Sequence, residues 1–164
     1  MEELTLRDVR EEDFEAFFEH QLDPVARHMA AFAAEDPADR DKFMERWRRI
    51  LANDKVVKKT ILCDGLVAGH IVSFTQLGET GVGYWLGKQY WGQGLATRAL
   101  AEFLEYVPTR PLYARVVKDN VASRRVLEKC GFKIHGEDRG FAHGRGEEVE
   151  EYVLRLDAPA RTIS

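Results

Sequence analysis

The hydrophobic residues near the start of the chain follow helical spacing after one short strand. Residues 4–7 (LTLR) alternate apolar and polar side chains, which predicts the strand. Phe14, Phe17 and Phe18 then recur at three- and four-residue spacing, which places them on one face of a helix over residues 12–20. The chain therefore opens with a strand followed by an amphipathic helix.

A second helix begins at Asp39, whose side chain is suited to cap the first turn. Its apolar face consists of Phe43, Met44, Trp47, Ile50 and Leu51. Residues 22–37, between the two helices, contain two prolines and mixed polarity, and we expect a partly helical connection there.

The pattern becomes strand-like at Lys58. Residues 59–74 form two β-rich runs around Asp64-Gly65, a strong hairpin signal, and residues 80–86 form a third run. A helix over residues 94–107 follows, and Pro108 stops it. Its apolar face consists of Ala96, Ala99, Leu100, Phe103, Leu104 and Val107.

The remainder of the chain predicts one more strand, one helix and a closing hairpin. The strand covers residues 112–117, and Asn120 caps a helix that runs to Cys130. Residues 132–137 and 150–156 then pair as antiparallel strands. This order predicts one α/β (α+β) domain with a mixed sheet over residues 1–157, followed by a loose tail over residues 158–164.

Composition narrows the class of protein. The 164 residues are 45% hydrophobic and 32% charged, and no apolar run reaches the length of a membrane span. The net charge of −4 argues against a nucleic-acid partner. The charged N-terminus is unlike a signal peptide, so we expect a cytoplasmic protein. Cys63 and Cys130 lie in apolar contexts without metal-ligand spacing, and we expect buried thiols and no metal.

Residues 89–97 (QYWGQGLAT) place two glycines at the entrance of a helix. The first N–H groups of a helix lack internal partners and attract anions, and Gly92 and Gly94 allow backbone to approach a phosphate closely. A Walker A loop is excluded, because Leu95 and Ala96 follow Gly94 where Lys and Ser or Thr are required. A dinucleotide fingerprint fits poorly, because Thr97 occupies its third glycine position.

The sequence QYWGQG resembles the Q/R-x-x-G-x-G/A pattern of the GNAT superfamily of N-acetyltransferases. Residues 82–100, 119–132 (DNVASRRVLEKCGF) and 22–29 (LDPVARHM) resemble the branch that includes ribosomal-protein N-terminal acetyltransferases. The resemblance implies a mostly antiparallel twisted sheet flanked by helices, acetyl-CoA as co-substrate and an amine acceptor. Similar proteins are commonly homodimers.

The resemblance also implies roles for individual residues. Leu86 would direct a backbone N–H at the thioester carbonyl, and Asn120 would contact pantetheine, besides capping its helix. One of Arg124 and Arg125 would reach coenzyme phosphates, with the other on a solvated face. The implied coenzyme-binding residues are Leu86, Gln89, Tyr90, Trp91, Gly92, Gln93, Gly94, Leu95, Ala96, Thr97, Asn120, Ser123 and Arg125.

The catalytic acid and base are less clearly marked. Many family members carry a tyrosine acid at the position held here by Leu127, so Ser123 becomes the candidate that contacts the leaving sulfur, unless it only bonds Asn120. Glu79 is the candidate base, against the alternative of a solvated carboxylate. The other candidates are His28, His70 and Tyr84, each with a structural alternative.

Together these features predict acetyl transfer to a primary amine by direct attack. An α-amine of pKa about 7.8 is partly neutral near pH 7.4, whereas a lysine of about 10.4 is almost fully protonated, so a weak base favours α-amines. Residues 28–37, including Met29 and Phe32, would line the acceptor pocket or the core. The acidic surface favours cationic acceptors. A coenzyme-A-binding sensor without catalysis is the alternative.

Overall fold

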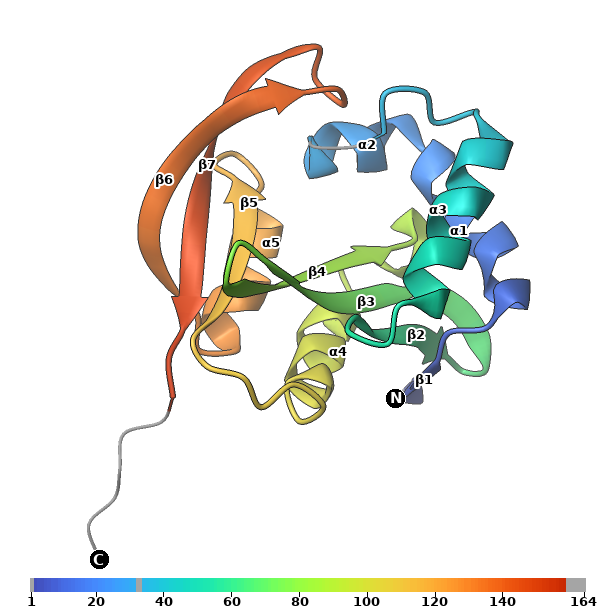
Figure 1. Ribbon diagram of the computed structural model, residues 1–164, viewed down its shortest axis with the longest axis horizontal. Helices are drawn as coiled ribbons and strands as arrows, with labels where there is room; N and C mark the ends of the chain where they lie inside the picture. Colours follow the sequence, from blue (N-terminus) through green and yellow to red (C-terminus); the bar gives the residue numbers. More distant parts are fainter. Residues whose placement is uncertain (1, 32–33, 159–164) are drawn as a thin grey trace, which may run out of the picture.

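Seven strands form one mixed sheet in the computed structural model, which describes residues 2–31 and 34–158 (Figure 1). The strands are β1 Leu4–Asp8, β2 Val57–Cys63, β3 Leu66–Gln76, β4 Glu79–Leu86, β5 Leu112–Val117, β6 Lys133–Ala142 and β7 Glu147–Leu156. Their order is β1-β2-β3-β4-β5-β7-β6, and every neighbouring pair is antiparallel except β4 and β5. This is the architecture that the sequence predicts.

The helices are α1 Phe14–Leu22, α2 Pro24–Ala30, α3 Arg40–Ala52, α4 Leu95–Phe103 and α5 Val121–Lys129. Helix α4 is shorter than its apolar spacing predicts. The N–H groups of Glu105, Tyr106 and Val107 donate to carbonyls three residues back, so the chain tightens into 3₁₀-like turns before Pro108. Within the described ranges, no helix has both the length and the apolar character of a membrane span.

Strands β4 and β5 are the only parallel neighbours in the described sheet, and they separate after a short contact. Thr80 pairs with Leu112 and Gly81 with Tyr113, and no later residues of the two strands pair. Figure 1 shows β5 turning away from β4 beyond this point. The C-terminal halves of both strands therefore border an opening in the middle of the sheet, and each strand leads toward the N-terminus of a helix, α4 or α5.

The sheet has a different core on each face. On the face covered by α4 and α5, the largest fully buried side chains of the main core include Leu95, Leu100 and Phe103 of α4 and Phe132 after α5. On the opposite face, α1 and α3 bury a smaller aromatic cluster around Phe17 and Trp47. The predicted amphipathic helices thus cover both faces, as layered packing requires.

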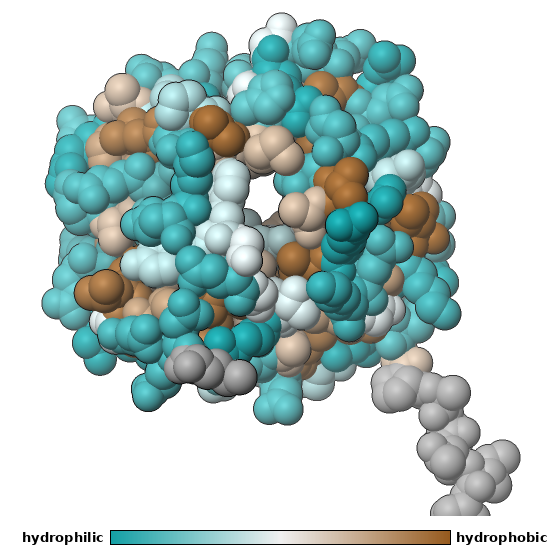
Figure 2. Space-filling view, turned by 180° about the vertical axis from the view of Figure 1, so that it is seen from behind, coloured by the Kyte–Doolittle hydropathy of each residue, from teal (hydrophilic) through white to brown (hydrophobic). Residues whose placement is uncertain are grey.

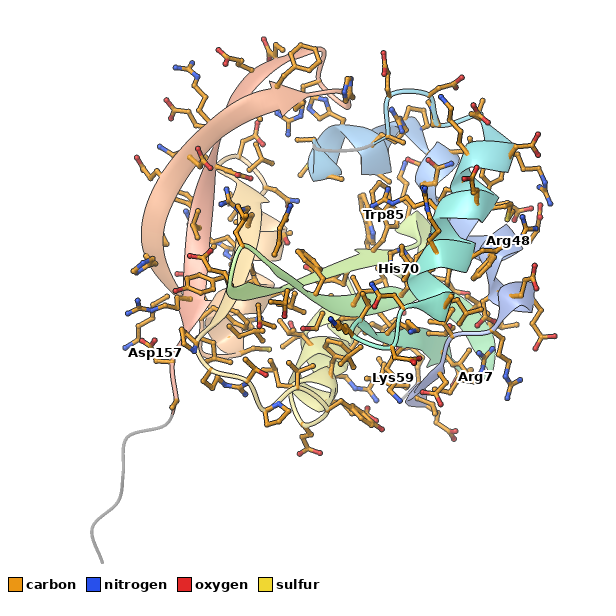
Figure 3. The ribbon with its side chains drawn as sticks, in the orientation of Figure 1. Arg7, Arg48, Lys59, His70, Trp85 and Asp157 are labelled. Atoms are coloured by element: carbon orange, nitrogen blue, oxygen red, sulfur yellow. The ribbon has the colours of Figure 1, made fainter. Side chains whose placement is uncertain are left out.

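His70 belongs to the smaller core, on the face that α1 and α3 cover. It pairs with Trp85 across β3 and β4, and Figure 3 shows both residues on this side. Its ring packs edge-on against Phe17 and Trp47, with centroids 4.9 and 4.7 Å apart. Burial, with the nearby His20 and Arg46, lowers the pKa of His70 to about 3. His70 is therefore a neutral core residue and does not line the cavity described below.

Of the tail predicted over residues 158–164, only residue 158 lies among the described residues, and Phe32 lies outside them. Cys63 is buried, as expected, whereas Cys130 is half-buried and therefore less buried than expected.

Candidate active site

A cavity of about 810 Å³ fills the opening between β4 and β5. It is lined by residues 82–86 of β4, residues 114–117 of β5, the loop and first turn of α4, one face of α5, part of α2, and Glu151 of β7. Figure 2 shows the surface deeply hollowed at the centre of the molecule. The cavity is bordered by elements from both faces of the sheet, so two ligands can enter it from opposite sides.

The loop before α4 has the conformation that its glycines allow. Gly92 and Gly94 have φ of 76° and 75°, and an added Cβ on either would meet no atom within 4 Å. Gly94 is the N-cap of α4, and the first helical bond from this end is from the N–H of Arg98 to the carbonyl of Gly94. The N–H groups between them are the unpartnered donors of a helix start, beside the cavity.

Most, but not all, of the residues implied to hold coenzyme line this cavity. Those that line it are Leu86, Tyr90, Trp91, Gly92, Gly94, Leu95, Ala96, Thr97, Asn120, Ser123 and Arg125. Gln89 and Gln93 do not line it, and the side chain of Gln93 instead donates to the carbonyl of Gln89 at 3.2 Å. Arg124 pairs with Glu128 at 3.3 Å, whereas Arg125 faces the cavity.

Leu86 ends β4 with its polar backbone groups turned away from β3. The indole Nε1 of Trp91 donates to the carbonyl of Leu86 at 2.9 Å, and the next residue, Gly87, donates to Ala68 of β3. In an antiparallel ladder both groups of one residue point to the same side, and successive residues alternate. The N–H of Leu86 therefore points toward the side from which β5 has separated.

A chain of hydrogen bonds joins β4, α5 and α2 across the cavity. The hydroxyls of Tyr84 and Ser123 lie 3.0 Å apart. The N–H of Ser123 donates to the Asn120 side chain at 3.2 Å, and the amide of Asn120 donates to the carbonyl of Met29 at 3.1 Å. Asn120 therefore both caps α5 and ties it to α2, while burial raises the pKa of Tyr84.

The sequence names Tyr84 and Ser123 as separate candidates, but not the hydrogen bond between them. Alternation along β4 places Tyr84 on the same side as the buried Val82 and Leu86. The partner on α5 could not be found that way, because it lies 39 residues later in the chain.

Glu79, the candidate base, is not brought to the cavity. It is the first residue of β4, seven residues before Leu86, which at about 3.3 Å per residue is about 23 Å away. Its side chain is exposed beside the β3–β4 turn. Strand alternation determines the face on which a side chain lies but not its position along the strand.

The other base candidates differ in their placement. His28 is exposed on α2 and does not line the cavity, whereas its neighbour Met29 does.

The structure shows neither an activated cysteine nor a group of metal ligands among the described residues. Burial raises the pKa of both cysteines, so neither is an activated thiolate. In the described part of the chain, no three His, Cys, Asp or Glu side chains are grouped as metal ligands.

Comparison with known proteins is consistent with this geometry. The model of the acetyltransferase (GNAT) domain matches residues 3–133. The chain is 28% identical over 137 residues to the putative ribosomal N-acetyltransferase YdaF of Bacillus subtilis (strain 168), covering 75% of this chain and 74% of that protein. It is 24% identical over 164 residues to the L-amino acid N-acetyltransferase AaaT of Escherichia coli (strain K12), covering 94% and 98%.

The fold also matches solved structures. RimJ of Mycobacterium smegmatis, in complex with CoA-disulfide, superposes with a TM-score of 0.77 at 23% identity, covering 94% of this chain and 82% of that one. The family match and the similarity of fold therefore agree with each other.

Proposed function

The chain belongs to the GNAT family of acetyl-CoA-dependent N-acetyltransferases, and we propose that its cavity moves an acetyl group to a peptide N-terminus or small-molecule amine by direct attack. We place this activity in one domain, residues 1–157. The observation that carries the proposal is the glycine loop and helix start of α4, which border the opening between β4 and β5.

The residues on the α4 side fit a coenzyme with a pyrophosphate. The positive φ of Gly92 and Gly94, the open space around them and the unpartnered N–H groups of the first turn of α4 together suit an anion. Arg125 and Lys129 of α5 add positive charge to the cavity lining. Bound acetyl-CoA would supply an activated thioester.

Leu86 at the end of β4 and Ser123 of α5 would stabilise the negative charge that develops during transfer. The N–H of Leu86 would donate to the thioester carbonyl, where a fixed donor stabilises developing negative charge. Ser123, oriented by Tyr84, would donate to the sulfur. Direct attack requires no protein nucleophile, which agrees with the raised pKa of Cys63 and Cys130.

The acceptor is proposed from chemistry and from the names of relatives. One relative is named a putative ribosomal N-acetyltransferase and another an L-amino acid N-acetyltransferase, and the second name points to an α-amine. An α-amine of pKa about 7.8 is partly neutral near pH 7.4, so it requires less assistance from a base than lysine does.

A matched peptide pair tests the proposal. One peptide carries a free N-terminus and no lysine, and the other carries a blocked N-terminus and one lysine. Thiol release from acetyl-CoA should be faster with the first peptide, or with small α-amines. Thermal stabilisation by acetyl-CoA without thiol release from any amine would instead support the coenzyme-binding sensor, and faster release with lysine would contradict the α-amine assignment.

A further inference from the structure

One acidic side chain lines the cavity among its described residues, and it is Glu151 of β7. Glu151 pairs with Val117 of β5, and Val117 packs against Ala31 after α2. Since paired residues of neighbouring strands project to the same face, the carboxylate lies on the α2 side of the sheet, opposite α4. Its side chain is only 8% exposed.

Arg115 forms ion pairs with both Glu151 and Asp138. Nη1 of Arg115 donates to Oε1 of Glu151 at 2.7 Å and to Oδ2 of Asp138 at 2.7 Å. No hydrogen bond from a described residue reaches Oε2 of Glu151. The three side chains together carry one net negative charge, and Oε2 of the mostly buried Glu151 remains available at the cavity.

A buried acceptor oxygen in an accessible cavity suits a positively charged donor. Burial of a carboxylate is unfavourable unless hydrogen bonds compensate for the lost water. The ammonium group of an amine can supply a charge-assisted hydrogen bond there. A carboxylate on the same acceptor would instead lie near Glu151, and like charges at close range are unfavourable.

We propose that Glu151, held by Arg115, binds the ammonium group of the acceptor and selects amines without a neighbouring carboxylate. The favoured acceptors are then peptide N-termini, amino-acid amides and diamines, and free amino acids are disfavoured. This inference rests on the proposed function, because it names the acceptor class of the same cavity. Glu151 acts here as a binding and specificity-determining residue. It holds the acceptor as the ammonium ion, and the amine attacks after one of its protons passes to water in the open cavity.

A pair of acceptors that differ only in the carboxylate tests the inference. L-Alaninamide and L-alanine share a side chain and an α-amine, but the carboxylate raises the pKa of the alanine amine, so their kcat/KM values are compared per neutral amine. On that scale the wild-type values should differ by about tenfold in favour of the amide. In Glu151→Gln, KM for alaninamide should rise about tenfold with a smaller change in kcat, and the preference for the amide should fall toward one.

Asp138→Asn is the matched control, because it removes a hydrogen bond to the same Arg115 nitrogen from a carboxylate that is half exposed and outside the cavity lining. It should keep the preference for alaninamide within about threefold. Glu151→Asp retains the charge and should retain the direction of the preference, which provides a second variant if Glu151→Gln does not fold.

The outcomes separate this inference from the proposed function. An unchanged KM for alaninamide in folded Glu151→Gln would overturn the inference, and so would a wild-type preference for alanine, which would indicate that Arg115 binds the acceptor carboxylate. Acetyl-CoA should stabilise the wild type and all three variants equally against heat. If the wild type released no thiol with any amine, the proposed function itself would fail.

Discussion

The two sides of the cavity are built from different parts of the chain and by different means. The α4 side comes chiefly from the loop after β4 and the first turn of α4, which adjoin in the chain, together with α5, and its loop offers backbone N–H groups. The α2 side combines side chains from α2, β5 and β7, with Glu151 and Arg115 separated by 36 residues. Backbone geometry thus dominates one side, and side-chain charge dominates the other.

This difference predicts which changes each side tolerates. A backbone site depends on φ angles, so a glycine substitution should damage it more than loss of a polar side chain such as Gln93, which does not line the cavity. A side-chain site depends on volume and charge, so single substitutions there should change acceptor choice while coenzyme binding persists. Four predictions test this contrast.

The largest expected effect is that of Gly94→Val on coenzyme binding. A β-branched residue at φ 75° is strained by up to about 3 kcal/mol, and relief of that strain would move the N–H groups at the start of α4. Calorimetry should show acetyl-CoA affinity reduced by about a hundredfold. Gly65→Val is the control, because Gly65 has φ 83° in the β2–β3 turn away from the cavity. Unchanged affinity in Gly94→Val would contradict the backbone assignment.

The second prediction concerns His70, in the smaller core that α1 and α3 cover. Because the pKa of His70 is about 3 in the folded state and near 6.5 when unfolded, the unfolded state binds more protons between these values. Stability contributed by neutral His70 is therefore lost as pH falls below about 6.5, by about 2 kcal/mol at pH 5. Urea unfolding at pH 7.5 and pH 5 should show a smaller pH dependence for His70→Leu.

The exposed His135 of β6 provides the control for that measurement. His135→Gln should retain the pH dependence of the wild type. If His70→Leu and the wild type lose the same stability between the two pH values, His70 is not the group responsible.

Gly83→Val should damage the α2 side without affecting the α4 side. Gly83 lines the cavity, pairs with Val72 of the smaller core, and has open space where a Cβ would project. The added side chain should raise the acceptor KM by about tenfold, equivalent to about 1.4 kcal/mol. Gly136→Val on β6 is the control, since Gly136 also has open space but does not line the cavity. A loss of acetyl-CoA affinity in Gly83→Val, with normal acceptor KM, would reverse the assignment of the two sides.

The smallest expected effect is that of Tyr84→Phe. It removes the hydroxyl 3.0 Å from Ser123 while retaining the ring, so Ser123 loses one orienting hydrogen bond worth about 1 kcal/mol. Steady-state kinetics should show kcat reduced by about fivefold with acetyl-CoA affinity unchanged. In a Ser123→Ala background, Tyr84→Phe should cause no further fall in kcat. If the losses in kcat were additive in the double variant, the two hydroxyls would not act together.

The sequence-based prediction of the site follows the same division. Gly92, Gly94 and the helix cap Asn120 are marked by signals within a few residues, whereas the role of Leu86 is implied by the family resemblance. Glu79 was placed by strand alternation, which does not show that the cavity opens at the far end of β4.

The order of elements, the apolar helix faces and the glycine loop can all be predicted from the sequence, because spacing and backbone conformation are local properties. Folding of the whole chain sets where β4 and β5 separate, brings Tyr84 to Ser123, and places the carboxylate of Glu151 at the cavity. These outcomes depend on the pairing of strands far apart in the chain, and strand register depends on packing across the whole sheet. The coenzyme side can therefore be read from adjacent residues, whereas the acceptor side exists only after the sheet has formed.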